Sequence, residues 1–111
     1  MKEELLKAID ELTVVQKEAM IWNDGPMLVL AGPGSGKTRV LTTRIARLLE
    51  ENENTRVLAL TYTTKASDEM RTRIRSLGSP EERALIGTFH SFCVNVLRKH
   101  GIHLNIKPDF S

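Results

Sequence analysis

A short apolar run that leads into a glycine-rich turn constrains this chain more than any other feature. Residues 27–38 read Met-Leu-Val-Leu-Ala-Gly-Pro-Gly-Ser-Gly-Lys-Thr, and an amphipathic helical pattern follows them. An apolar strand, a glycine-rich turn and Gly-Lys-Thr in this order are typical of a phosphate-binding loop. Because glycine lets consecutive backbone N–H groups curl around an anion, the turn predicts a polyphosphate site at the end of a strand.

The residue types in this loop suit a bound nucleotide with its magnesium ion. Lys37 supplies a positive charge for the outer phosphates, and the Thr38 hydroxyl can reach Mg²⁺. The following helix points its positive N-terminus at the same anion. Ala31 stands where the usual pattern has glycine, and it is small enough for the turn to survive. The alternative interpretation is a glycine-rich surface turn without a function. The predicted nucleotide-binding residues of the loop are Ala31, Gly32, Pro33, Gly34, Ser35, Gly36, Lys37 and Thr38.

Length and composition set broad limits. A chain of 111 residues with 41% hydrophobic residues forms one domain at most, with one small core. The net charge of +2 permits nucleic acid as a partner but does not argue for it. The single cysteine, Cys93, excludes an internal disulfide, and its apolar helical surroundings predict a buried, unreactive thiol.

The sequence contains no sign of membrane attachment. No apolar run approaches the length of a membrane span, and the acidic first residues lack the apolar core of a signal peptide. We therefore expect a cytoplasmic protein.

Apolar periodicity divides the chain into alternating helices and strands. Thr13 and Gln16 have the spacing of a capping box, so we expect a new helix to begin at Thr13. Alternation of strands and helices predicts an α/β fold with a parallel sheet and right-handed crossovers. We expect buried strands at 27–31, 56–61 and 84–88, and helical stripes at 5–12, 13–22, 41–49, 66–77 and 89–97, the last of which stops at Gly101.

Hydroxyl and aromatic residues follow the second and third predicted strands. The two segments are 61–65, Thr-Tyr-Thr-Thr-Lys, and 88–91, Thr-Phe-His-Ser. Because ligands bind at the carboxyl ends of parallel strands, both segments should share an edge with the phosphate loop. Hydroxyls and a lysine suit phosphates, and rings suit stacked bases, so the pair suits single-stranded nucleic acid. The alternative is that the hydroxyls are ordinary helix N-caps, that Phe89 belongs to the core, and that His90 is a surface histidine.

Four segments together resemble superfamily 1 DNA helicases of the UvrD/Rep/PcrA type, in the same order and over nearly the whole chain. Residues 12–16 (Leu-Thr-Val-Val-Gln) resemble the Q motif, and 31–38 resemble motif I, in which an initial Ala is usual. Residues 57–70 resemble motif Ia, and 86–93 resemble motif Ib. Motif Ia usually reads Thr-Phe-Thr-Asn-Lys-Ala, so Tyr62 and Thr64 depart from the pattern.

The resemblance implies a partial RecA-like P-loop domain whose cofactors are ATP and Mg²⁺. It places Gln16 at the adenine edge and Arg39 near the base or ribose, and it makes Lys37 and Thr38 catalytic. The implied partners are single-stranded DNA and duplex junctions. Seven residues of motifs Ia and Ib would contact DNA: Thr61, Tyr62, Thr63, Lys65, Thr88, Phe89 and His90.

One element that the resemblance requires is not found in the sequence. The family's ATPase uses an apolar strand ending in Asp-Glu to hold Mg²⁺ and orient the attacking water. Here Asp10, Asp24, Asp68 and Asp109 all have helical or loop contexts. We therefore expect residues 1–111 to be the N-terminal part of an ATP-binding helicase domain, truncated before the accessory 1B insertion and the Asp-Glu motif. Such a part would bind nucleotide but hardly hydrolyse it.

Two other classes of protein remain open at this point. A small P-loop phosphotransferase would need only residues 1–38, although no phosphoacceptor pocket with a catalytic acid is evident. A non-enzymatic module that binds nucleotide or DNA is favoured by the missing acidic motif.

Overall fold

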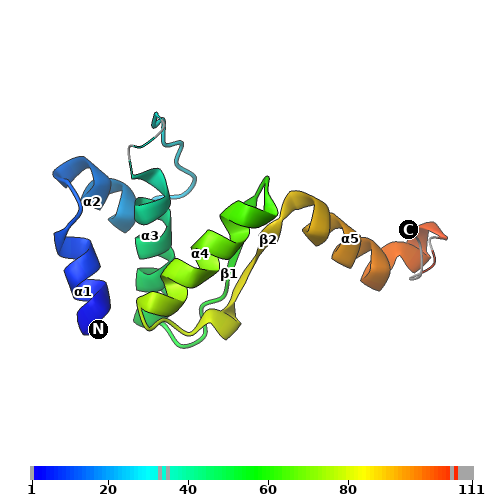
Figure 1. Ribbon diagram of the computed structural model, residues 1–111. Coiled ribbons are helices and arrows are strands. Elements are labelled where there is room, and N and C mark those ends of the chain that lie inside the picture. The colour runs from blue at the N-terminus through cyan, green and yellow to red at the C-terminus, as the bar shows by residue number, and fades with distance from the viewer. Residues whose placement is uncertain (1, 33, 35, 106, 108–111) are drawn as a thin grey trace.

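The computed structural model describes residues 2–32, 34, 36–105 and 107, and it shows a mixed α/β chain (Figure 1). Its helices are α1 (Glu3–Asp10), α2 (Val14–Ile21), α3 (Lys37–Glu51), α4 (Thr64–Ser76) and α5 (Phe89–His100), its strands are β1 (Val57–Thr61) and β2 (Ala84–Thr88), and short 3₁₀ turns cover Glu81–Arg83 and Gly101–Leu104.

The two strands pair in parallel, which confirms the predicted α/β class. Val57 lies opposite Ala84, and Thr61 lies opposite Thr88. The connection between them contains α4, as a parallel pair requires. Because the register aligns the last residues of both strands, the segments that follow them leave the sheet at one edge.

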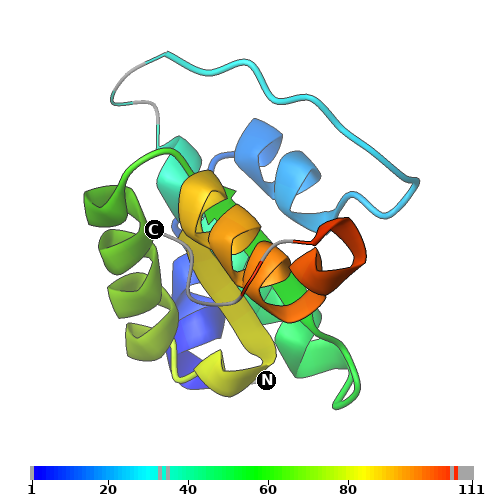
Figure 2. The same ribbon diagram turned by 90° about the vertical axis from the view of Figure 1, so that its right-hand side faces the viewer.

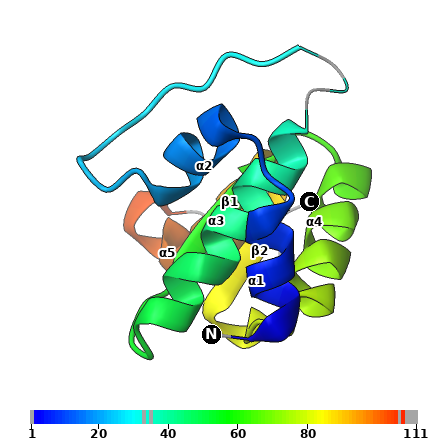
Figure 3. The ribbon, with the colours of Figure 1, turned by 90° about the vertical axis from the view of Figure 1, so that its left-hand side faces the viewer.

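A small core lies between the sheet and two helices. Ala59 and Ile86 are register partners on the buried face of the sheet. They pack against Ile45 and Leu49 of α3 and against α4. The chain is layered, with α1 and α2 outside α3 (Figure 3) and with α5 in front of the strands on the other side (Figure 2).

Side-chain caps begin three of the helices, as local sequence predicts. Thr13 and Gln16 form the expected capping box at the start of α2. Thr63 accepts a hydrogen bond from the Ala66 N–H at 3.1 Å at the start of α4. Thr88 accepts one from the Ser91 N–H at 3.0 Å at the start of α5. These caps satisfy N–H groups that have no partner within the helix.

The predicted strand at 27–31 is wrong. These residues belong to an extended segment that pairs with neither strand. Leu28 and Leu30 are 83% and 87% exposed. A strand that is apolar on both faces needs neighbours at its edges and a cover on each face, and the described residues provide neither. The radius of gyration, 16.0 Å, accordingly exceeds the ~13 Å expected for a compact chain of about this length.

The predicted burial of Cys93 is also wrong, because its thiol is exposed. Helix α5 begins at Phe89 as expected and has Gly101 as its C-cap, but none of its residues is fully buried. Phe92, Val94 and Leu97 are partly buried, and the other residues of this helix are exposed. Among the same residues, no helix combines the length and the apolar character that crossing a membrane requires.

A matched pair of leucines tests where the stability of the fold originates. Leu49 is fully buried in the core and Leu28 is exposed. We expect Leu49→Ala to lower the free energy of unfolding by about 2–5 kcal/mol, because it leaves a cavity. Leu28→Ala should change it by less than about 0.5 kcal/mol. Urea denaturation followed by circular dichroism measures both values, and equal effects would contradict this description of the core.

Candidate nucleotide and nucleic-acid site

The phosphate-loop segment makes its turn through glycines in a left-handed conformation. Gly34 has φ 74° and Gly36 has φ 83°. Gly36 is also the N-cap residue of α3, whose first residue is Lys37. Residues that carry a side chain rarely adopt these φ values, so glycine is needed at both positions. Pro33 and Ser35, which the sequence also assigns to the loop, lie outside the described residues.

Two positive charges stand in the first turn of α3. Lys37 and Arg39 are exposed there, and the turn contains no acidic residue. Cations are unfavourable at the positive end of a helix dipole, whereas an anion is favourable. The glycine turn, the free end of the helix and these charges therefore form a site whose electrostatics suit a polyphosphate. Thr38 follows at the same end and is partly buried.

Gln16 lies directly against this turn. A Cβ atom added at Gly36 would lie 3.0 Å from Nε2 of Gln16. The Oε1 atom of Gln16 accepts a hydrogen bond from the Thr13 N–H at 2.9 Å, within the capping box of α2. The structure thus brings Gln16 of the predicted Q motif and Gly36 of the predicted phosphate loop together, although they are twenty residues apart in the sequence.

A hollow of about 520 Å³ joins the start of α3 to the end of β1. Met27 and Val29 of the extended segment form one wall. Residues of α3 and α4 form the others, among them Lys37 and Met70. Thr61, the last residue of β1, lines the same hollow, so the phosphate loop and motif Ia face a common space.

The segments that follow β1 and β2 meet at the edge of the sheet. The rings of Tyr62 and Phe89 contact each other, with centroids 5.2 Å apart and planes tilted by 37°. Tyr62 is 91% exposed and Phe89 is 46% exposed. Phe89 therefore lies at the surface and not in the core. Both rings are accessible to solvent at this edge.

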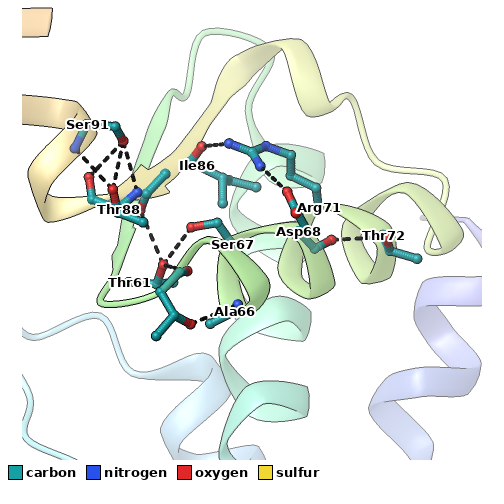
Figure 4. Close-up of polar contacts among 11 residues, drawn as sticks. Thr61, Ala66, Ser67, Asp68, Arg71, Thr72, Ile86, Thr88 and Ser91 are labelled. Carbon is teal, nitrogen blue, oxygen red and sulfur yellow. Dashed lines mark hydrogen bonds and ion pairs between the residues drawn. The ribbon is translucent and has the colours of Figure 1, made fainter.

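Polar side chains link α4 to both strands (Figure 4). Thr61 Oγ1 lies 2.9 Å from the Thr63 carbonyl oxygen and 2.6 Å from Ser67 Oγ. A hydroxyl has one proton, so Thr61 donates to the carbonyl and accepts from Ser67, which is buried. Arg71 adds a hydrogen bond to the Ile86 carbonyl and an ion pair with Asp68. The edge that presents Tyr62 is therefore held by three elements.

The remaining predicted DNA-contacting residues divide into two groups. Thr63 and Thr88 cap helices, as the alternative interpretation proposed, so their hydroxyls already have partners. Lys65 and His90 are exposed in the first turns of α4 and α5. Arg39, another predicted nucleotide-binding residue in the first turn of α3, lines a small cleft with residues of α1 and α4.

Sequence reasoning missed several residues that organise this region. Ser91 completes a capping box with Thr88. The pattern is hard to recognise in the sequence because Ser stands where a capping box usually has Glu or Gln. Ser67 lies six residues after Thr61, and no sequence pattern pairs them. Arg44 and Arg47 of α3 donate hydrogen bonds to the end of α2, which helical periodicity does not predict.

The described residues contain no cluster of three or more His, Cys, Asp or Glu side chains that could hold a metal ion. The Asp-Glu pair at 10–11 lies at the end of α1, and the pair at 68–69 lies within α4. Neither pair ends a strand. Thr38 is the predicted contact for Mg²⁺, which a bound nucleotide would bring with it.

Comparison with known proteins identifies a family. The UvrD/REP helicase N-terminal domain matches residues 12–111. The protein named ATP-dependent DNA helicase PcrA from Staphylococcus aureus (strain Mu50 / ATCC 700699) is 43% identical over 106 residues, which is 93% of this chain and 14% of that protein. The protein of the same name from Bacillus subtilis (strain 168) is 48% identical over 103 residues, which is 90% of this chain and 14% of the relative. The chain thus spans about one seventh of the length of these relatives.

Two glycines of the loop test the geometry of the turn. Gly36→Ala places a Cβ at positive φ and against Gln16, whereas Gly32→Ala meets no atom within 4 Å at an ordinary φ. We expect Gly36→Ala to lower the free energy of unfolding by about 1–2 kcal/mol and to shift the NMR signals of the Gln16 side-chain amide. Gly32→Ala should leave both unchanged. Unchanged Gln16 signals in Gly36→Ala would contradict the described contact.

Proposed function

The chain belongs to the UvrD/REP helicase N-terminal domain family, and we propose that it is the ATP-binding part of an ATP-dependent DNA helicase that translocates on single-stranded DNA. One observation carries this proposal. The phosphate loop, the adjoining Gln16 and the carboxyl ends of two parallel strands converge on one side of the molecule.

We propose that ATP with Mg²⁺ binds at residues 31–38. Lys37 and the N–H groups at the start of α3 would hold the β- and γ-phosphates, and the Thr38 hydroxyl would contact Mg²⁺. The positive φ values of Gly34 and Gly36 and the absence of acidic residues from this turn support the assignment. Gln16 is proposed to read the adenine edge from its position beside Gly36. Arg39 is proposed to lie near the base or ribose.

We propose that single-stranded DNA crosses the edge where Tyr62 and Phe89 meet. Stacking on such rings is worth roughly 1–3 kcal/mol for each base. The exposure of both rings supports this role, as do the exposed Lys65 and His90 beside them. The hydroxyl groups of Thr61, Thr63 and Thr88 would contribute to the same track, although each also has a structural partner. Duplex junctions are the expected substrate of the whole protein.

Residues 1–111 are proposed to form the N-terminal part of a RecA-like domain that lacks the Asp-Glu motif and the 1B insertion. Two observations support this: the exposed apolar segment at 27–31 and the match to one seventh of the relatives' length. In the complete domain, further strands would pair with this segment. The chain alone is proposed to bind nucleotide with very little hydrolysis, because the carboxylates that would orient water are missing.

A pair of lysines separates the two proposed binding sites. Lys37→Met should weaken binding of a non-hydrolysable ATP analogue with Mg²⁺ by about tenfold or more, because a hydrogen bond to a charged group contributes roughly 1.5–3 kcal/mol. Isothermal titration calorimetry measures this affinity. Lys65→Met should leave it unchanged and should instead reduce the salt dependence of binding to labelled oligothymidine, measured by fluorescence anisotropy.

The two lysines are matched controls because both are exposed in the first turn of a helix. Equal binding of the ATP analogue by Lys37→Met and the natural chain would contradict the role of the phosphate loop. Loss of nucleotide binding in both variants would show that the effect is not specific to the loop.

A further inference from the structure

The structure raises the question of what holds α2 in place. Helix α2 carries Gln16 in its first turn, and α3 begins with Lys37. The segment that connects the two helices contains no helix or strand among its described residues. The position of Gln16 beside the phosphate loop therefore depends on direct contacts between α2 and α3, which lie side by side (Figure 3).

Two arginines of α3 reach the carboxyl end of α2. Arg44 Nη1 donates hydrogen bonds to the carbonyl oxygens of Ala19 at 3.2 Å and Met20 at 3.1 Å. Arg47 Nε donates to the same Met20 carbonyl at 3.2 Å. Carbonyls in the last turn of a helix have no partner within it, and a positive charge there is favoured by the helix dipole.

The environment of the arginines makes these contacts costly to break. The Arg47 side chain is buried, and it also contacts Glu51 at 2.7 Å and the Asn23 side chain at 3.3 Å. Burial, and secondarily the positive charge of Arg47, lower the pKa of Arg44. The buried guanidinium ion of Arg47 needs acceptors, and the Met20 carbonyl at the end of α2 provides one.

Helix α2 is thus held against α3 at its last turn and approaches the start of α3 at its first turn. Its last turn is hydrogen-bonded to Arg44 and Arg47, and its first turn places Gln16 against Gly36. Displacement of the last turn would tilt the whole helix, because α2 has only eight residues. It would therefore move Gln16 relative to the phosphate loop.

We propose that Arg44 and Arg47 are positioning residues of the nucleotide site: by holding α2 against α3 they keep Gln16 beside the phosphate loop and so set the preference for an adenine base. This inference rests on the proposed role of Gln16. A competing role exists for Arg44, because it lines the same hollow as Lys37 and could act on the phosphates directly.

Binding of three ligands distinguishes these roles. ATP and GTP share a triphosphate and differ in the base, whereas inorganic tripolyphosphate has no base. With Mg²⁺ present, calorimetry on Arg44→Met and Arg47→Met should show that the preference for ATP over GTP is lost while the affinity for tripolyphosphate is retained. Arg56→Met, which replaces an exposed arginine just before β1, should change none of the three affinities. An equal loss of affinity for all three ligands in Arg44→Met would overturn the positioning role in favour of a direct phosphate contact.

A measurement without nucleotide keeps the inference testable if the proposed function fails. Trp22, the only tryptophan, caps the end of α2, and its indole N–H donates to the Gly25 carbonyl at 3.1 Å. We expect a shift of its fluorescence emission and faster hydrogen exchange of residues 14–21 in Arg44→Met and Arg47→Met, but not in Arg56→Met. Unchanged hydrogen exchange in both variants would overturn the inference that Arg44 and Arg47 hold α2 in place. Equal binding of ATP and GTP by the natural chain would instead refute the proposal that Gln16 recognises the adenine base. It would not affect the inference that Arg44 and Arg47 hold α2 against α3.

Discussion

The parallel pairing of β1 with β2 is the constraint on which the rest of this structure depends. Its register aligns Thr61 with Thr88, so the segments after the two strands leave the sheet together. The same register places Ala59 beside Ile86 on the face that α3 and α4 cover, and this small core holds the start of α3 near the end of β1. A shift by one residue would turn the apolar side chains of one strand to the opposite face.

The site follows from this arrangement together with local chemistry. Two glycines at positive φ shape the turn before α3, and the contact between Gln16 and Gly36 joins the Q motif to it. The hydroxyl pair of Thr61 and Ser67 anchors the strand end that presents Tyr62. The proposed phosphate-binding turn and the two rings proposed to stack on bases are thus held by neighbouring parts of one small core.

The sequence predicted those elements whose signals are local. The capping box at Thr13 and the strand at 84–88 are confirmed, because hydrogen bonds and periodicity over a few residues decide them. The strand at 27–31 and the burial of Cys93 were wrong, because pairing and burial depend on what the rest of the chain places nearby. Nor could periodicity reveal that Arg44 and Arg47 reach the end of α2, since tertiary packing alone brings those groups together.

The most direct test of this description is the contact between the two rings at the edge of the sheet. Tyr62 is the only tyrosine, so its ring protons are readily assigned by NMR. The parallel register predicts nuclear Overhauser effects between the rings of Tyr62 and Phe89, together with backbone effects between Thr61 and Thr88. Backbone effects that pair Thr61 with a different residue of β2, without effects between the rings, would contradict the register and the shared edge that depends on it.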